Sequence, residues 1–275
     1  MKTQDLYNRS LFAILRLDTT LKENNARLAG TGFIINTNPL YILTCNHVVG
    51  EGNENNNGKI QYAIIKRSDG SSEFDLTKVQ ISFIKAKKII TKPEFDIAIL
   101  EIDLESDKKI AELLGIPNNI KALEIDFADT EIGAPVEWIG VGTLGDLSLT
   151  PRFFKGNIVT KYIKDQNYIY INPESKEQIQ LMKAVRFMEI NQLFLPGCSG
   201  GPIVSERNKV IGWVHGFNSW PIQTNNMVEY NATLSDDSTS QEVKIKTKSI
   251  IGASLSLGIE IKNVKEFLLD NKLII

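Results

Sequence analysis

The sequence predicts an all-β protein. Short apolar segments with alternating or β-branched residues recur along the whole chain, and Gly, Asn and Pro separate them. A regular alternation of strands and long helical segments, which would indicate an α/β fold, is not seen. At 275 residues the chain can bury a core in one large domain or in two smaller ones. Short strands at this spacing are typical of a β-barrel or a β-sandwich.

The first half of the chain contains six predicted strands. The expected strands cover residues 9–17, 30–35, 41–44, 59–66, 79–86 and 96–102. A polar turn about residues 22–25 and a hairpin turn about residues 36–39 connect the first three. We expect the Asn-rich segment 50–58 to be an exposed loop, and residues 104–120 to form a crossover with room for one helical turn.

The second half repeats the same pattern of short strands. They are expected at residues 135–142, 153–163, 168–171, 184–190, 203–204, 210–214 and 249–258. The polar segment 218–249 is interpreted as an exposed, partly disordered loop, with a substrate-binding or partner-binding loop as the alternative. Residues 261–269 have apolar side chains at helical spacing and predict a terminal amphipathic helix.

Composition excludes several classes of function and suggests a location. The net charge is 31 − 33 = −2 and no basic stripe is present, so a nucleic-acid partner is not expected. No apolar window approaches the roughly 20 residues of a membrane-spanning helix. Residues 1–17 lack the pattern of a secretory signal, and two cysteines are too few for a disulfide framework. We therefore expect a cytoplasmic protein, and the richness in Ile, Asn and Lys suggests a bacterial source.

The stretch with the most specific chemistry is residues 196–204 (Pro-Gly-Cys-Ser-Gly-Gly-Pro-Ile-Val). Glycines on both sides of Ser199 allow the backbone to fold sharply, which presents the hydroxyl in a cleft with backbone N–H groups beside it. The apolar residues that follow predict a hairpin. The segment is therefore expected to be a loop that presents a nucleophile at the entrance to two buried strands.

Three segments together resemble the trypsin-like (chymotrypsin-fold) serine proteases. The Gly-Xaa-Ser-Gly-Gly-Pro string resembles the nucleophile motif of that family. Residues 44–49 (Thr-Cys-Asn-His-Val-Val) resemble its histidine motif, and residues 95–100 (Phe-Asp-Ile-Ala-Ile-Leu) its aspartate motif. The chain order His47, Asp96, Ser199 is that of the family, with intervals of 96 − 47 = 49 and 199 − 96 = 103 residues.

The resemblance implies a fold of two six-stranded antiparallel β-barrels with a C-terminal α-helix. The boundary is placed near residue 120. Residues 1–120 would then form the N-terminal barrel that carries His47 and Asp96, and residues 121–275 the C-terminal barrel that carries Ser199 and the terminal helix.

The resemblance also implies a serine endopeptidase that works through an acyl-enzyme. His47 would be the general base, Asp96 would orient its imidazole, and the backbone N–H groups of Gly197 and Ser199 would form the oxyanion hole. Taken singly, these residues have ordinary alternatives: a buried core histidine, a strand cap and a glycine-rich turn. No cofactor or metal ion is expected.

The walls of the substrate pocket are placed by the same resemblance at His215, Gly216, Phe217 and Ser254. For His215 two interpretations stay open: support of Asp96 or simple packing, and recognition of an acidic substrate side chain. No acidic residue stands where trypsin binds Lys or Arg, so we expect small or medium apolar side chains to be preferred.

Cys198 stands where digestive relatives carry the aspartate that pairs with a new N-terminal amine. Activation by N-terminal cleavage is therefore not expected, and constitutive activity or ordering by a partner is favoured. A thiolate nucleophile is the alternative to Ser199, but the motif places Cys198 one residue before the nucleophile position, so Cys198 is not expected to be catalytic. A Cys45–Cys198 disulfide is an alternative, but two buried free thiols are the default expectation.

The expected partners are a protein or peptide substrate and a regulatory protein or a stress or defence signal. The competing hypothesis is a pseudoprotease that binds a peptide or partner in its cleft without cutting it. An esterase that uses the same residues is a third.

Overall fold

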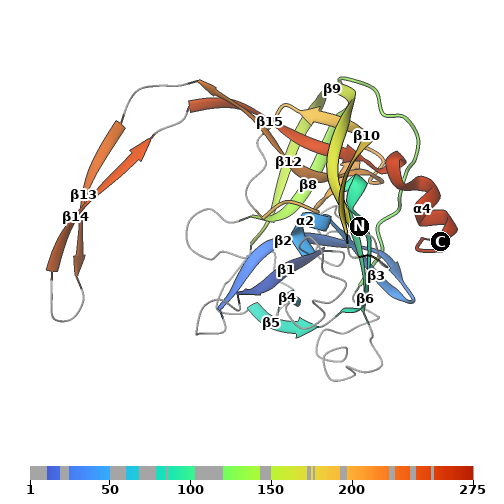
Figure 1. Ribbon diagram of the computed structural model, residues 1–275, viewed down its shortest axis with the longest axis horizontal. Coiled ribbons are helices and arrows are strands. Elements are labelled where there is room, and N and C mark those ends of the chain that lie inside the picture. Colours follow the sequence, from blue (N-terminus) through green and yellow to red (C-terminus); the bar gives the residue numbers. More distant parts are fainter. Residues whose placement is uncertain are drawn as a thin grey trace.

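The computed structural model describes residues 11–18, 25–49, 60–67, 79–84, 86–102, 120–142, 150–171, 175, 177–192, 197–222, 227–235, 240–248 and 251–274. Most of them belong to antiparallel strands, which form a seven-stranded sheet, a closed barrel and a separate two-stranded ribbon (Figure 1). The prediction of a mostly β protein is therefore confirmed. The predicted loop 50–58 and the crossover 104–120 lie outside the described residues, except residue 120.

The first sheet contains the N-terminal strands and delivers two of the candidate site residues. In the order in which they are hydrogen-bonded, its strands are β5 (Val79–Ile84), β4 (Ile60–Arg67), β1 (Leu11–Asp18), β2 (Asn25–Thr37), β3 (Leu40–Thr44), β7 (Ile97–Ile102) and β6 (Ala86–Lys92). The predicted hairpin between β2 and β3 is present, with its turn at Asn38 and Pro39. Phe33, Leu43 and Ile99 are fully buried on the strands at the centre of this half.

The second sheet closes into a barrel of six strands. Its strands in order are β10 (Gln178–Ile190), β15 (Ile251–Glu260), β12 (Val210–Ile222), β11 (Pro202–Ser205), β8 (Pro135–Gly142) and β9 (Thr150–Ile171). One of its apolar clusters contains Trp138, Met188, Ile203 and the buried sulfur of Cys198. The loop that contains Ser199 therefore begins inside the packed part of the barrel.

A second, larger core joins the two sheets. It contains Ile34 and Leu100 from the first sheet together with Phe187 and Trp213 from the barrel. The segment after residue 120 reinforces this junction, because the N–H of Leu123 donates to the carbonyl oxygen of Ile34 at 2.9 Å. Burial of apolar surface is the dominant favourable contribution to folding, so this shared core holds the two sheets in a fixed arrangement.

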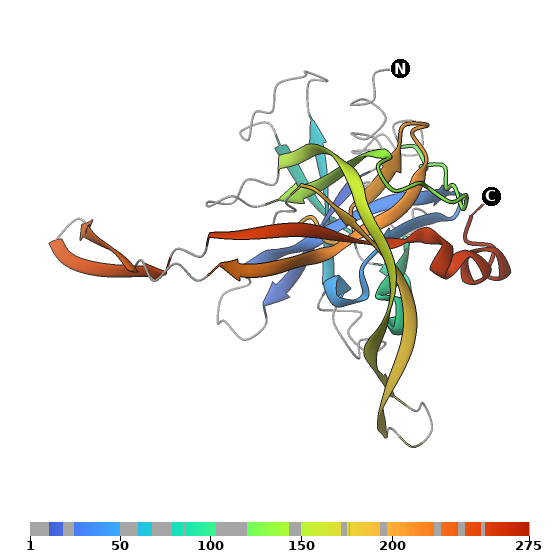
Figure 2. The same cartoon turned by 90° about the horizontal axis from the view of Figure 1, so that it is seen from above.

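Two segments differ from the expectations of the sequence. The predicted strands 153–163 and 168–171 are one 22-residue strand, β9, which pairs with β10 through the polar stretch where a break was expected. Segment 218–249 was wrongly interpreted as a loop. It contains the end of β12 and the ribbon of β13 (Met227–Ser235) and β14 (Ser240–Lys248), which extends away from the body of the molecule (Figures 1 and 2).

The mostly β part of the fold prediction is confirmed, but the prediction of two six-stranded barrels is not. The strands of the second half form a closed six-stranded barrel, whereas those of the first half form a seven-stranded sheet whose outer strands, β5 and β6, are not paired with each other in the described residues. The terminal helix is present as a 3₁₀ turn, η4 (Ile261–Val264), that continues into α4 (Lys265–Asp270). Within the described residues no helix has the length and apolarity needed to span a membrane.

Candidate active site

Asp96 lies in a tight turn between two strands of the first sheet. The turn is the 3₁₀ helix η3 (Pro93–Phe95), which follows β6 and ends at Asp96 in the left-handed conformation, with φ of 50°. Asp tolerates this region better than most residues because its short polar side chain can bond locally. The carbonyl oxygen of Asp96 accepts a hydrogen bond from the N–H of Asn46 at 3.1 Å. This bond links the turn to the segment that contains His47.

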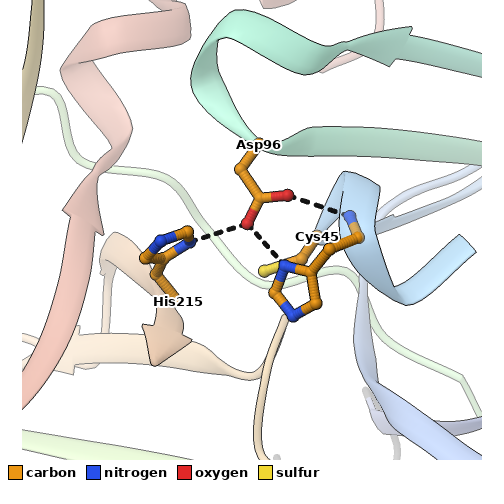
Figure 3. A group of neighbouring side chains, drawn as sticks. Cys45, Asp96 and His215 are labelled. Carbon is orange, nitrogen blue, oxygen red and sulfur yellow. Dashed lines mark hydrogen bonds and ion pairs between the residues drawn. The ribbon is translucent and has the colours of Figure 1, made fainter. Parts of the chain in front are cut away.

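His47 lies on the short helix α2 (Asn46–Val49), directly after β3. Its backbone N–H donates to Oδ1 of Asp96 at 2.9 Å, and its Nδ1 lies 2.7 Å from Oδ2 of the same carboxylate (Figure 3). The side chain of His47 is 43% exposed and that of Asp96 only 6%. The carboxylate thus holds His47 at two points, its backbone N–H and one ring nitrogen, while part of the ring is accessible to a substrate.

His215, on β12, contributes a second imidazole to the same carboxylate. Its Nδ1 lies 2.7 Å from Oδ2 of Asp96, and the rings of His47 and His215 meet edge to face, with centroids 5.8 Å apart (Figure 3). This direct contact is consistent with the interpretation of His215 as a support of Asp96.

The charge state of Asp96 follows from these contacts. Burial by itself would raise the pKa of Asp96, but the hydrogen bonds and charges of His215 and His47 outweigh burial and hold the pKa far below its usual range. An ionised carboxylate only accepts hydrogen bonds. Both histidines therefore carry a proton on Nδ1, which leaves Nε2 of a neutral His47 as an acceptor.

The Ser199 loop is built by glycines and anchored to the other sheet. Gly197 and Gly200 have φ of 91° and 84°, a region in which a side chain is strained. Thr31 of β2 holds the loop by two bonds, because its N–H donates to the carbonyl oxygen of Ser199 and its Oγ1 donates to that of Gly197, both at 2.8 Å. The sequence predicted the glycines but not the role of Thr31, for which only its place between Gly30 and Gly32 gave a signal.

Gly200 lies against both halves of the site. A Cβ atom at this position would overlap the carbonyl oxygen of Thr31 and Oγ1 of Thr44. Its N–H donates to the carbonyl oxygen of Val214 at 2.8 Å. The loop therefore fits closely between β2, β3 and β12, and only glycine fits at this point.

The hydroxyl of Ser199 lies at the junction of the loop and β12. Its Oγ donates to the carbonyl oxygen of His215 at 3.4 Å. Ser199 and His215 thus come from the barrel, whereas His47 and Asp96 come from the first sheet. The structure brings these four residues together from segments far apart in the sequence.

Both cysteines are free and buried, as the default expectation had it, and the disulfide alternative is wrong. Sγ of Cys45 donates to the carbonyl oxygen of Val214 at 3.2 Å. Burial raises the pKa of the Cys45 thiol well above its usual value, and the negative charge of Asp96 raises it further. Cys198 packs against Gly140 of β8, where an added Cβ would overlap its side chain.

The four residues predicted to line the substrate pocket lie on two neighbouring strands. Gly216 is paired with Leu257, Phe217 with Ser256, and Ser254 with Ser219, across β12 and β15. The side chains of Phe217 and Ser254 lie outside the described part of the structure. Their contribution to specificity stays a prediction, as does that of Gly216.

The fold and the site together define a class of protein. A β-sheet that carries a bonded His–Asp pair, followed by a closed six-stranded barrel that presents a glycine-flanked serine, is the arrangement of a chymotrypsin-like protein. Residues 30–212 match the trypsin-like peptidase domain. Since this match covers more than half of the chain, the protein belongs to the trypsin-like peptidase family, as the three sequence motifs predicted.

Curated relatives are bacterial proteases. Proteins described as probable periplasmic serine endoproteases, DegP-like, from Pseudomonas fluorescens and Pseudomonas putida are each 27% identical over 191 residues. The match covers 70% of this chain and 30% of each relative. The chain therefore spans less than a third of the length of these curated relatives.

Solved structures share the fold at low sequence identity. The active form of the Rv3671c protease from M. tuberculosis superimposes with a TM-score of 0.55 at 17% identity, covering 98% of this chain and 83% of that chain. Deg5 gives a TM-score of 0.50 at 15% identity, covering 78% of this chain and 82% of that one. At these identities the comparison shows the fold alone.

The expected cytoplasmic location is contradicted by these relatives, which are described as periplasmic. The expectation relied on the small number of cysteines and on the composition of the first residues. A low cysteine count is a weak argument, because a chain of this length can bury enough apolar surface to fold without disulfides, and the oxidising periplasm permits disulfides without requiring them.

Proposed function

We propose that this protein is a serine endopeptidase in which Ser199 is the nucleophile, His47 the general base and Asp96 the residue that orients the base. The observation that carries the proposal is the double attachment of His47 to Asp96, through its backbone N–H at 2.9 Å and its Nδ1 at 2.7 Å. Such an attachment fixes the tautomer in which Nε2 can accept a proton. Membership of the trypsin-like peptidase family supports peptide-bond hydrolysis as the reaction.

In the proposed reaction, Oγ of Ser199 attacks the carbonyl carbon of the peptide bond while Nε2 of His47 takes the hydroxyl proton. The hydroxyl turns from the carbonyl oxygen of His215 toward His47 for this step, since catalytic hydrogen bonds are often long before substrate binds. The C–N bond then breaks as His47 protonates the amine. Water, activated by the same base, hydrolyses the acyl-enzyme.

The oxyanion of the tetrahedral intermediate is proposed to bind the N–H groups of Gly197 and Ser199. In support, neither N–H donates to another backbone carbonyl within the described part of the chain. Thr31 bonds the carbonyl oxygens of both residues, and the carbonyl oxygen of Cys198, which shares a peptide unit with the Ser199 N–H, accepts from the N–H of Gly201 at 2.9 Å. These bonds limit movement of the loop. Loss of one donor from such a hole costs roughly 3 kcal/mol of transition-state stabilisation.

We also propose that the substrate is a polypeptide that binds against β12 and β15, near Gly216, Phe217 and Ser254, and that a partner or a stress or defence signal regulates cleavage. The two sheets would correspond to the two barrels of a chymotrypsin-like fold, divided near residue 120. Recognition of an acidic side chain by His215 is disfavoured, because its Nδ1 already bonds Asp96.

The test is covalent labelling of the purified chain and of Ser199→Ala with a fluorophosphonate, followed by mass spectrometry. One adduct on Ser199, absent from the variant, supports an activated nucleophile. Digestion of a proteome-derived peptide library then distinguishes an endopeptidase from an esterase and reports the residue preferred before the cut. No adduct, in a folded chain with the far-ultraviolet circular dichroism of a β protein, contradicts an activated nucleophile in the isolated chain and favours the pseudoprotease.

A further inference from the structure

Four potential metal ligands converge behind the base of the candidate triad. Cys45, His47, Asp96 and His215 each offer one ligand atom, and these atoms all lie within 4.8 Å of one another. Figure 3 shows the sulfur of Cys45 next to the carboxylate that both imidazoles contact. A serine peptidase mechanism uses two of these residues and needs neither the thiol nor a second imidazole.

We propose that Cys45, His47, Asp96 and His215 form an inhibitory site for Zn²⁺ that switches the peptidase off. The proposal rests on the proposed function for its effect on activity, but the binding of the metal does not depend on catalysis.

The donor set and its spacing fit zinc. A tetrahedral zinc ion with bonds of about 2.0–2.3 Å separates its ligand atoms by roughly 3.3–3.7 Å. The two Nδ1–Oδ2 distances of 2.7 Å lie below this range, and the limit of 4.8 Å lies above it. Movements of about 1 Å therefore suffice. One thiolate, two imidazoles and one carboxylate favour Zn²⁺, Co²⁺ or Cd²⁺ over Mg²⁺ and Ca²⁺.

The charges also balance. A divalent cation with one thiolate and one carboxylate gives a net charge of zero, which suits a site in which Cys45 and Asp96 are buried. Burial and the negative charge of Asp96 hold the pKa of the Cys45 thiol high, so the charge of the bound cation has to favour the thiolate. Binding releases the thiol proton to solvent, while each imidazole keeps one proton, which moves from Nδ1 to Nε2.

That change of tautomer is the reason for inhibition. His47 with a metal ion on Nδ1 carries its remaining proton on Nε2, the atom that must accept the proton of Ser199. The ring can then donate but cannot act as a base. Zinc should therefore reduce kcat and leave KM little changed, because Gly216, Phe217 and Ser254, the proposed substrate contacts, are not among the ligands.

The experiment measures peptidase activity and cobalt spectra on the full chain after removal of metals with a chelator. We expect micromolar Zn²⁺ to inhibit, Mg²⁺ and Ca²⁺ to have no effect, and added chelator to restore the rate. Cys45→Ser should raise the half-inhibitory zinc concentration at least 10-fold, since even outer-shell changes cost about 10–100-fold in affinity. Cys198→Ser is the matched control and should keep the zinc sensitivity, with each variant compared with its own metal-free rate.

A second measurement separates this inference from the proposed function. Ser199→Ala cannot form an acyl-enzyme, yet Co²⁺ should bind it with the tetrahedral and thiolate-to-metal bands of a sulfur-ligated site. Those bands should be absent from the folded Cys45→Ser, Ser199→Ala double variant. Absence of the bands from Ser199→Ala, or equal zinc sensitivity with and without Cys45, would overturn the inference.

Discussion

Asp96 is the residue on which the candidate site depends most. It accepts two imidazole N–H groups on one oxygen and a backbone N–H on the other. An amide in its place has one acceptor oxygen and one donor NH₂ group. It therefore cannot satisfy both histidines and the backbone in the same arrangement.

Replacement of Asp96 by Asn is expected to reduce kcat by about 10⁴-fold, because His47 would be held in the wrong tautomer. The measurement is kcat on a peptide found in the library digestion. Binding of that peptide to Asp96→Asn in a Ser199→Ala background is the control and should be unchanged. A loss of less than 10-fold would show that Asp96 does not orient the base.

His215 is expected to be a positioning residue that acts through Asp96. His215→Ala removes one of the two imidazole donors and should reduce kcat by about 10-fold with little change in KM. His215→Gln keeps an N–H donor that can reach the carboxylate and should recover most of the rate. A rise in KM with kcat unchanged, in both variants, would instead indicate that His215 binds substrate.

At the scale of elements, Gly200 in the Ser199 loop is required for two separate reasons: its backbone conformation and the lack of space for a side chain. Gly133, outside this loop, shares only the first. Gly133 and Gly200 both have positive φ, of 89° and 84°. A Cβ on Gly133 would meet nothing within 4 Å, whereas one on Gly200 would overlap backbone and side-chain atoms of the first sheet. The pair thus separates the cost of backbone conformation from the cost of overlap.

Gly133→Ala should therefore lower the free energy of unfolding by about 1–2 kcal/mol, the cost of a left-handed residue with a side chain. Gly200→Ala should lower it by more than about 3 kcal/mol, because overlap with Thr31 and Thr44 adds to that strain. Urea unfolding followed by tryptophan fluorescence gives both values. Equal losses in the two variants would mean that the loop can move away from β2.

Much of the site could be predicted because its residues lie within short, specific patterns. The histidine and aspartate motifs each join a buried strand to the functional side chain, and glycines surround Ser199. The contacts of Thr31 and Cys45 could not be predicted, because they cross between segments more than 150 residues apart. Such contacts depend on how the two sheets pack, which local patterns do not specify.

The strands that were not predicted also depend on pairing with other segments, which local patterns do not specify. Polar residues near the middle of β9 suggested a break, but Gln166 and Asn167 pair with Lys183 and Met182 of β10 and stay extended. The ribbon of β13 and β14 was interpreted as a loop because its composition is polar. Antiparallel pairing can extend polar segments once a hairpin has set the register. Propensity alone therefore underestimated both strands.

At the scale of the whole molecule, the charge of Asp96 is coupled to folding. Its pKa is lower in the folded protein than in the unfolded chain, where it is about 3.9. A lowered pKa stabilises the fold at pH values above that of the unfolded group, and the contribution is lost as the pH falls below it. The folded protein therefore resists protonation of this carboxylate.

The free energy of unfolding of the wild type should accordingly fall between pH 5 and pH 3 more steeply than that of Asp96→Asn. Chemical unfolding at several pH values, with Asp126→Asn as a surface control, measures the difference. Parallel curves for the wild type and Asp96→Asn would mean that the histidines do not hold the carboxylate ionised.

The bonds of Thr31 make the conformation of the Ser199 loop depend on the first sheet. The carbonyl groups of Gly197 and Ser199 are held by a residue of the first sheet, so a barrel that had folded by itself would lack these bonds as well as the proposed base, His47. A nascent or partly unfolded chain would therefore be harmless to its neighbours. The proposed hydrolytic activity would then require that the two halves of the polypeptide have met.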